Sequence, residues 1–317
     1  MAEPTDAAVA EPAGAEPAGA LPAAVALAAS QAAPGFLQDL LSLTKPRLSS
    51  LVLFTAGGGL ALAPVEVPAT QALAGILGTT LVVGGANTLN CYLERDSDGN
   101  MARTATRPLP RRRLDPRVAL VFGVLLSVVS VGLLTLATPP LAGLLAALAL
   151  VLYVLVYTPL KRISSLSVLV GAIPGALPPV IGWVAATGRI DPPALVLFGV
   201  LFLWQVPHSL AIGIYREAEY TRAGLVVHTA EHGIAATRRQ MLVYTMGLFP
   251  VPLLLVRLDV AGLPTAVAGS ALGAILLYSA FEGWRQQGGA RWARRFFFLT
   301  LLYMTGLFAA LVVDHQV

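Results

Sequence analysis

The sequence predicts an all-α polytopic membrane protein with nine transmembrane helices. Hydrophobic residues make up 56% of the 317 residues and charged residues only 12%, a composition that excludes an ordinary soluble domain. The apolar residues form nine runs, each close to the roughly 20 residues that an α-helix needs to cross a bilayer. The single cysteine, Cys91, excludes an internal disulfide framework.

The first part of the chain differs from the rest. Residues 1 to about 33 consist mainly of Ala, Pro, Glu and Gly, with almost no large or aromatic side chains. Such a segment cannot bury enough apolar surface to fold. It has no Lys or Arg, so it lacks the features of a secretory or mitochondrial targeting segment. We expect a disordered tail at 1–33, followed by one membrane domain at 34–317.

The nine apolar runs are spread along this membrane domain. Their approximate limits are 48–65, 69–92, 118–138, 140–160, 166–187, 193–215, 240–258, 264–282 and 295–313. The fifth run contains Gly171, Gly175 and three prolines. We therefore expect a kinked or broken helix there, with its backbone shielded by neighbouring helices.

The basic residues are unevenly distributed among the connections between the runs. Cytoplasmic connections of membrane proteins carry an excess of Lys and Arg. With a cytoplasmic N-terminus, all of the 21 Lys and Arg residues except Arg189 and Arg257 fall on the cytoplasmic side. The net charge of +4 is therefore a topology signal and gives no indication of nucleic-acid binding. An odd number of spans places the C-terminus on the far, periplasmic or extracellular, side.

Three polar segments open on the same cytoplasmic side, after the second, fourth and sixth runs. Their sequences are ERDSDGNMARTATRPL, YTPLKR and YREAEY. In the first, Asn90, Glu94 and Asp98 are four residues apart and share one helix face, and Gly99 offers a helix stop. Carboxylates at a helix C-terminus face the negative end of the helix dipole, which a divalent cation offsets. Mg²⁺ binds one or two carboxylates together with phosphate oxygens and water, so these three residues predict a magnesium site.

Positive side chains suited to a diphosphate follow these acids. Arg103 and Arg107 lie a helical turn apart beyond Asp98, and Lys161 and Arg162 close the fourth run. Topology alone accounts for the arginines at 111–113. We expect the other four to bind diphosphate. The predicted catalytic residues are Asn90, Glu94, Asp98 and Lys161.

The sixth run carries a polar stripe. Gln205, His208, Arg216 and Glu219 recur at helical spacing, so one face of this helix is polar. A lone membrane histidine is often a structural hydrogen bonder, which is the alternative to a ligand-binding role for His208. Arg216 and Glu219 form a second acidic site, in which Glu219 is predicted to contact the metal or the diphosphate.

Other polar residues have plainer interpretations. Asn87 is expected to form a hydrogen bond between helices, and Asp96 is expected to be a solvated charge on the face opposite Asp98. His228 and His232 are four residues apart and suit a metal on one helix face, but no third ligand is evident.

Five motifs occur in order at residues 43–47, 90–109, 157–162, 175–183 and 204–209. They read LTKPR, N-x₃-E-x₃-D-x₂-M-x-R-T-x₂-R-P-L, YTPLKR, GALPPVIGW and WQVPHS. Together they resemble the protoheme IX farnesyltransferases, or haem O synthases, a branch of the UbiA-type intramembrane prenyltransferases. The N-x₃-D-x₃-D core is typical of the superfamily, whereas MxRTxxRPL and WQxPHS are narrower signatures.

The resemblance implies nine transmembrane helices around a central cavity under a cytoplasmic cap, in the bacterial plasma membrane. The implied reaction transfers farnesyl from farnesyl diphosphate to a vinyl group of haem b with Mg²⁺, and gives haem O and pyrophosphate. A place in haem A biosynthesis for terminal oxidases implies a haem A synthase or an oxidase assembly factor as partner. By position, the resemblance implies metal–diphosphate binding by Asn90, Glu94 and Asp98, neutralisation of pyrophosphate by Arg103, Arg107, Lys161 and Arg162, and porphyrin contact by Gln205 and His208.

The sequence departs from the family pattern at three places. Glu94 and Glu219 stand where aspartate is usual, and Ser167 stands where many relatives have asparagine. Residues 227–229 replace the Leu-Pro pair that commonly follows Ala-Gly in the third polar segment. This last change alters the segment that follows Glu219.

Two other functions remain open on the sequence alone. Prenyl transfer to a quinone precursor or a chlorophyll-type acceptor would keep the cluster at 90–98 but does not need the WQVPHS stripe. A transporter or assembly factor that binds haem or an anion without reaction is the third. A transporter would be expected to show internal repeats, and the sequence contains no convincing one.

Overall fold

The structure is a computed structural model that describes residues 35–315, and no β-strand occurs among these residues. The chain divides into the units Met1–Gly35 and Phe36–Val317. The tail predicted at 1–33 lies outside the described residues. The second unit is all-α, as the sequence predicts, and it contains every residue of the predicted site.

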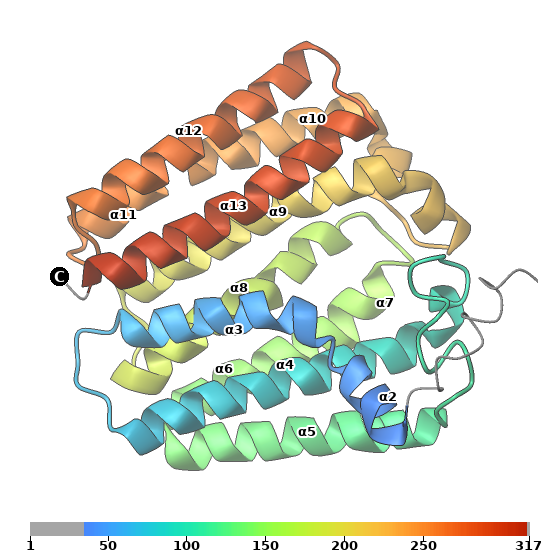
Figure 1. The fold of residues 1–317 in the computed structure, drawn as a ribbon, viewed down its shortest axis with the longest axis horizontal. Helices are drawn as coiled ribbons and strands as arrows, with labels where there is room; N and C mark the ends of the chain where they lie inside the picture. The colour runs from blue at the N-terminus through green and yellow to red at the C-terminus, as the bar shows by residue number, and fades with distance from the viewer. Residues whose placement is uncertain (1–34, 316–317) are drawn as a thin grey trace, which may run out of the picture. The chain divides into compact units, whose positions relative to one another are not determined.

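The helices of this unit run largely side by side (Figure 1). They are α2 (Phe36–Leu43), α3 (Pro46–Ala61), α4 (Ala69–Asp98), α5 (Pro116–Ala137), α6 (Pro140–Val151), a π-helical segment (Leu152–Tyr157), α7 (Thr158–Leu160), α8 (Ser167–Thr187), α9 (Pro192–Arg222), α10 (His228–Leu248), α11 (Val251–Arg257), α12 (Leu263–Arg285) and α13 (Ala290–His315). Every one of the nine predicted runs has a helical counterpart.

Eight helical segments of residues 35–315 are long and apolar enough to cross a membrane. They are Ala69–Asp98, Pro116–Ala137, Pro140–Leu160, Ser167–Thr187, Pro192–Arg222, His228–Arg257, Leu263–Arg285 and Ala290–Asp314. The first predicted span, 48–65, corresponds to α3, which has only 16 residues. The prediction of a polytopic helical membrane protein is confirmed, whereas a ninth crossing stays a prediction.

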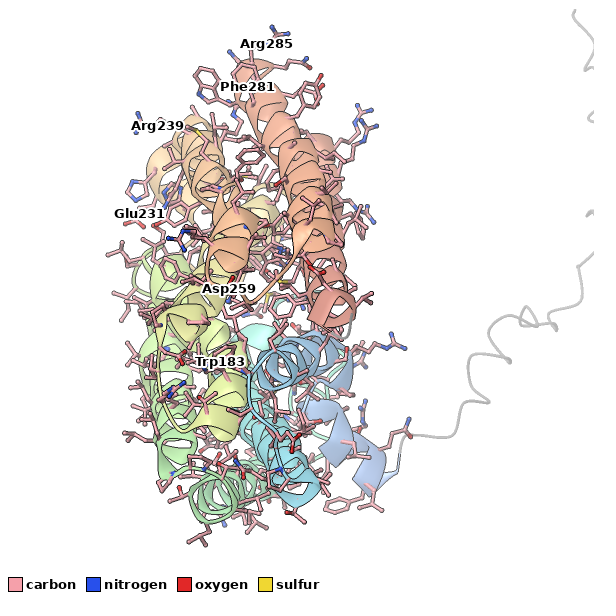
Figure 2. All side chains as sticks on the ribbon, turned by 90° about the vertical axis from the view of Figure 1, so that its left-hand side faces the viewer. Trp183, Glu231, Arg239, Asp259, Phe281 and Arg285 are labelled. Atoms are coloured by element: carbon pink, nitrogen blue, oxygen red, sulfur yellow. The ribbon has the colours of Figure 1, made fainter. Side chains whose placement is uncertain are left out.

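α8 continues unbroken through the three prolines of the fifth predicted span. Of the expected kinked or broken helix, the broken form is therefore wrong. α8 packs against α3, α4, α6 and α9, and such neighbours shield the backbone groups that prolines leave unpaired. α8 and α3 lie so close together that their backbones are almost in contact. A Cβ at Gly182 would collide with the carbonyl of Ala56, and one at Gly59 would collide with the backbone of Pro179. Small residues at such a crossing let two backbones touch, and Trp183 is buried beside it (Figure 2).

The three predicted polar segments lie at the same end of the helices, on the right of Figure 1. Direct contacts join them: Arg162 Nη2 donates to the carbonyl of Leu93, and the backbone N–H of Arg103 donates to Glu219 Oε1 at 3.5 Å. The YREAEY segment forms the last turns of α9 and is not a connection, since α9 extends over 31 residues. A helix of that length exceeds what a bilayer requires, so its end projects beyond the apolar layer.

Candidate active site

One face of α4 carries the predicted acidic cluster. Asn90, Glu94 and Asp98 are 1%, 7% and 2% exposed, and α4 ends at Asp98 with Gly99 as its C-cap. By contrast, the side chain of Asp96 is 84% exposed, as expected for a solvated charge. Two carboxylates are thus buried at the C-terminal end of a helix, where they need positive partners.

Each of these three side chains contacts one cation from a different part of the chain. Lys45 Nζ donates to Asn90 Oδ1 at 2.7 Å, Lys161 Nζ pairs with Glu94 Oε1, and Arg107 Nη1 pairs with Asp98 Oδ2 at 2.6 Å. The cations come from the start of α3, the end of α7 and the loop after α4. Three segments that are distant in sequence therefore meet on one face of α4.

Lys45 is a residue of this site that the sequence analysis did not single out. It caps the N-terminus of α3 with φ 52° and ψ 57°, and it precedes Pro46. A left-handed conformation is strained for a residue with a side chain, and such strain is often kept at functional sites. Burial lowers the pKa of Lys45, and the nearby charges of Arg107 and Lys161 lower it further. The lysine of the LTKPR motif, directly before a span, is the signal that points to it.

A π-helical segment positions Lys161 and Thr158. Residues Leu152–Tyr157 form π-helical turns between α6 and α7, a feature common at functional sites. Thr158 Oγ1 donates to the Tyr153 carbonyl at 2.8 Å and accepts from Asn90 Nδ2 at 3.1 Å. Burial disfavours the charge on Lys161, but Tyr157 and the Glu94 carboxylate outweigh it and raise the pKa of Lys161. Lys161 is therefore a cation at any physiological pH.

The other two predicted diphosphate ligands surround this face. Arg162 Nη2 donates to Leu93 O and Ser97 Oγ, both at 3.3 Å. Arg103 is exposed, and its backbone N–H contacts Glu219. Arg103 and Arg107 lie in a series of turns, not on the helix that their spacing suggested.

The loop that carries Arg107 is attached to α2 by a second ion pair. Arg113 Nη2 and Nε donate to the two oxygens of Asp39 at 2.8 Å and 3.0 Å, and Asp39 is 4% exposed. The hydrogen bonds that Arg113 donates to the Asp39 carboxylate raise the pKa of Arg113. Arg113, which the sequence analysis assigned to membrane topology, therefore anchors the loop.

The donor set on α4 fits a magnesium ion in its chemistry. Two carboxylates and one amide offer oxygen ligands, and Mg²⁺ takes its remaining ligands from phosphate and water. Among residues 35–315, no group of three or more His, Cys, Asp or Glu side chains lies close enough to hold a metal. Glu219 is therefore not gathered with Glu94 and Asp98, and it pairs with Arg216 at 2.6 Å.

His208 of α9 lies between aromatic rings. Its ring centroid is 4.6 Å from those of Trp204 and Phe297. His208 Nδ1 lies 2.7 Å from Thr300 Oγ1, whose hydroxyl donates to the Phe297 carbonyl at 2.6 Å. The hydroxyl of Thr300 thus lies within hydrogen-bond distance of both the Phe297 carbonyl and Nδ1 of His208, and it holds the imidazole from one side.

The other polar residues considered in the sequence form ordinary contacts within or between helices. Gln205 Nε2 donates to Leu201 O at 3.4 Å on its own helix. Asn87 donates to the Thr44 carbonyl and to Ser49 Oγ, an interhelical contact as expected. His228 and His232 have ring centroids 4.6 Å apart, and no third ligand joins them within the described part of the chain.

Comparison with known proteins identifies the family of this chain. Residues 51–302 match the UbiA prenyltransferase family. A protoheme IX farnesyltransferase of Anaeromyxobacter sp. (strain Fw109-5) is 50% identical over 92% of this chain and 99% of its own length. One of Myxococcus xanthus (strain DK1622) is 47% identical over 91% of this chain and 98% of its own.

Solved structures share the fold at low sequence identity. A digeranylgeranylglyceryl phosphate synthase superposes with a TM-score of 0.75 at 15% identity, covering 88% of this chain and 98% of that one. A UbiA homologue from Archaeoglobus fulgidus bound to DMAPP and Mg²⁺ has a TM-score of 0.65 at 17% identity, covering 87% and 99%. These similarities show the fold, and the sequence relatives confirm the resemblance. The chain belongs to the UbiA prenyltransferase family, in the branch that contains the protoheme IX farnesyltransferases.

Proposed function

We propose that this chain transfers the farnesyl group of farnesyl diphosphate to a vinyl group of protoheme IX, giving haem O and pyrophosphate. The observation that carries the proposal is the 50% identity, over nearly the whole of both chains, to a protoheme IX farnesyltransferase. The buried face of α4, with three oxygen donors and three cations, supports a site for a metal-bound diphosphate. Neither a quinone-type acceptor nor transport without chemistry has comparable support.

The proposed chemistry needs a neutralised leaving group and a dry cavity. The bond between C1 of farnesyl and the diphosphate oxygen breaks, and its electron pair leaves with pyrophosphate. Mg²⁺ held by Asn90, Glu94 and Asp98 would neutralise part of that charge. Lys161 and Arg107, with Arg103 and Arg162 around them, supply the rest. No nucleophilic residue of the protein is required.

The acceptor then reacts with the allylic cation. A vinyl carbon of the porphyrin forms the new carbon–carbon bond, and the positive charge moves to the carbon next to the ring. Water captures this second cation and loses a proton, which gives the hydroxyl group of the product. The helices must keep water from the first cation, since early capture would only hydrolyse the diphosphate.

Binding of the diphosphate requires an exchange of partners on α4. Lys161 and Arg107 contact Glu94 and Asp98 in the structure. With a divalent cation on Glu94 and Asp98, the side chains of Lys161 and Arg107 would be free to bind the diphosphate oxygens. All four charged groups would then be paired in both states, so that substrate binding would leave no buried charge unpaired.

The proposed setting is the bacterial plasma membrane, with the site and the N-terminus on the cytoplasmic side. The distribution of Lys and Arg supports this orientation. Nine crossings and a central cavity under a cytoplasmic cap belong to the same proposal. A haem A synthase or oxidase assembly partner stays a prediction.

Product analysis on isolated membranes tests the function. Membranes containing the chain are supplied with haem b, farnesyl diphosphate and Mg²⁺, and the extracted haems are separated and weighed by mass spectrometry. A haem heavier by one farnesyl group and one hydroxyl group is expected. If haem b is present and returns unchanged, the proposal is wrong, and a quinone precursor is the next acceptor to supply.

A further inference from the structure

A pocket lies between the end of α9 and the start of α13, and Glu219 forms part of its lining. Its volume is about 570 Å³, within the usual range of small-molecule sites. Three arginines line it, Arg216 and Arg222 from α9 and Arg294 from α13, together with aromatic side chains. We call it the arginine pocket.

The charge of the arginine pocket is unbalanced. Glu219 is the one acidic residue in its lining, and it is already paired with Arg216. Arg222 uses Nε to donate to the Ala218 carbonyl at 3.1 Å, which leaves its two terminal nitrogens for another acceptor. Within residues 35–315, neither Arg222 nor Arg294 forms an ion pair. Two guanidinium groups therefore face a cavity without a counter-charge, and guanidinium groups bind carboxylates in a bidentate manner.

The aromatic wall of the arginine pocket continues to the ring of His208. Phe297 lines the pocket, and its ring centroid lies 4.6 Å from that of His208 and 6.0 Å from that of Tyr215. Along α9, His208 and Arg216 are separated by about 12 Å of helical rise. A flat aromatic ligand with a charged edge fits such a surface, with its ring near the aromatic side chains and its charge near the arginines.

We propose that the arginine pocket binds the two propionate carboxylates of the porphyrin acceptor. This inference rests on the proposed function. In protoheme IX the vinyl groups and the propionates lie on opposite sides of the ring. Propionates held by Arg222 and Arg294 therefore turn the vinyl edge away from the pocket. The arginine pair sets both the choice of acceptor and the orientation in which the acceptor is presented to the allylic cation.

The binding of haem b and of its dimethyl ester tests this assignment. The ester has the same ring and iron but no carboxylates. Both are titrated into the purified full-length chain in neutral detergent and followed by the haem absorption band, with no turnover required. We expect the wild-type chain to bind haem b at least tenfold more tightly than the ester, a difference of about 1.4 kcal/mol. Equal affinities would overturn the assignment.

Variants test whether Arg222 and Arg294 cause the preference for haem b over its dimethyl ester. Arg222→Gln with Arg294→Gln should bind haem b and the ester equally, whereas Arg295→Gln, an exposed neighbour outside the pocket lining, should keep the preference. If the double variant does not fold, Arg294→Gln alone should lose several-fold in affinity for haem b and none for the ester. A full preference in the folded variants would contradict the proposal.

A lipid phosphate presents the same anionic oxygen chemistry and is the competing occupant. The titrations are therefore repeated in vesicles of phosphatidylcholine with and without phosphatidylglycerol. If the arginine variants change only the response to phosphatidylglycerol and keep the haem preference, the pocket binds lipid and the propionate assignment fails. Because binding is measured directly, an arginine-dependent preference without farnesyl transfer would count against the proposed function alone.

Discussion

Lys161 and Glu94 form an ion pair that joins the end of α7 to the buried face of α4. The same arrangement recurs one turn further along α4, where Arg107 pairs with Asp98. In both pairs, a predicted metal ligand is bound by a predicted diphosphate ligand. The site thus contains two buried pairs of opposite charge. The proposed reaction requires each charged group to exchange its partner for another group of opposite charge.

Replacement of Lys161 by methionine should strongly impair transfer. The variant leaves Glu94 buried without its cation and removes one positive charge from the diphosphate site. Loss of one such electrostatic contact costs roughly 100-fold in rate. Steady-state assays should show this loss with a raised KM for farnesyl diphosphate and a nearly unchanged KM for haem b.

Lys161→Arg is the matched control, because it keeps the charge and should recover part of the rate. A methionine variant with the wild-type rate would show that the ion pair is only structural.

Replacement of Thr300 by valine should weaken the binding of haem b and leave the binding of farnesyl diphosphate unchanged. Thr300 Oγ1 and His208 Nδ1 share a hydrogen bond, so valine removes the group that fixes the orientation of the imidazole. We expect KM for haem b to rise about tenfold, which corresponds to one lost hydrogen bond of ordinary strength. Thr300→Ser keeps the hydroxyl and should restore the wild-type value, and an equal rise in KM for farnesyl diphosphate would contradict this role.

Replacement of Gly182 by alanine should destabilise the fold. The added Cβ would collide with the backbone carbonyl of Ala56, which cannot move without separating α3 from α8. Overpacking of this kind typically costs 1–3 kcal/mol, and we expect a value of about 3 kcal/mol because the obstacle is backbone. Thermal unfolding in detergent measures the loss.

Gly199→Ala is the control, since no atom lies within 4 Å of a Cβ at this position of α9. Equal unfolding temperatures for the two alanine variants would show that the close crossing of α3 and α8 is absent.

Replacement of Asp39 by asparagine should loosen the loop that carries Arg107. The change removes the carboxylate that binds Arg113 through two hydrogen bonds. We expect a loss of stability of about 2 kcal/mol, in the range for hydrogen bonds to charged groups. Proteolysis should become faster within residues 99–114, whereas Arg111→Gln, an exposed arginine of the same loop, should leave the cleavage rate unchanged. Unchanged proteolysis of the Asp39 variant would exclude the anchoring role.

The sequence predicts the helices of this protein well because long apolar runs have few alternatives to a membrane helix. The shared helix face of Asn90, Glu94 and Asp98 also follows from their spacing, since residues four apart lie on the same side of a helix. The prolines of the fifth run predict a kink or a break with a shielded backbone, but they do not show which of these forms occurs, because that depends on how α8 packs against its neighbours. Hydropathy ends the sixth run at residue 215 because it detects only the apolar layer, whereas the helical spacing of Arg216 and Glu219 indicates that the helix continues past it, as α9 does.

The partners of the α4 cluster were less predictable. Lys45 lies 45 residues before Asn90, and only the tertiary packing of α3 on α4 brings its ammonium within 2.7 Å of the amide. The role of Arg113 was missed because a basic residue in a connection has a sufficient explanation in membrane topology. The π-helical turns before Thr158 leave no clear signal in a run of apolar residues.

Magnesium-dependent binding of a farnesyl diphosphate analogue that does not ionise tests the central claim most directly. The wild-type chain, Asp98→Asn and Asp96→Asn are compared by calorimetry with and without Mg²⁺. Asp96 is the matched control, since it is an exposed carboxylate two residues away on the same helix. We expect Mg²⁺ to strengthen binding to the wild-type and Asp96→Asn chains at least tenfold and to have little effect on Asp98→Asn. An equal effect of Mg²⁺ on all three chains would contradict the assignment of the α4 face as the metal–diphosphate site.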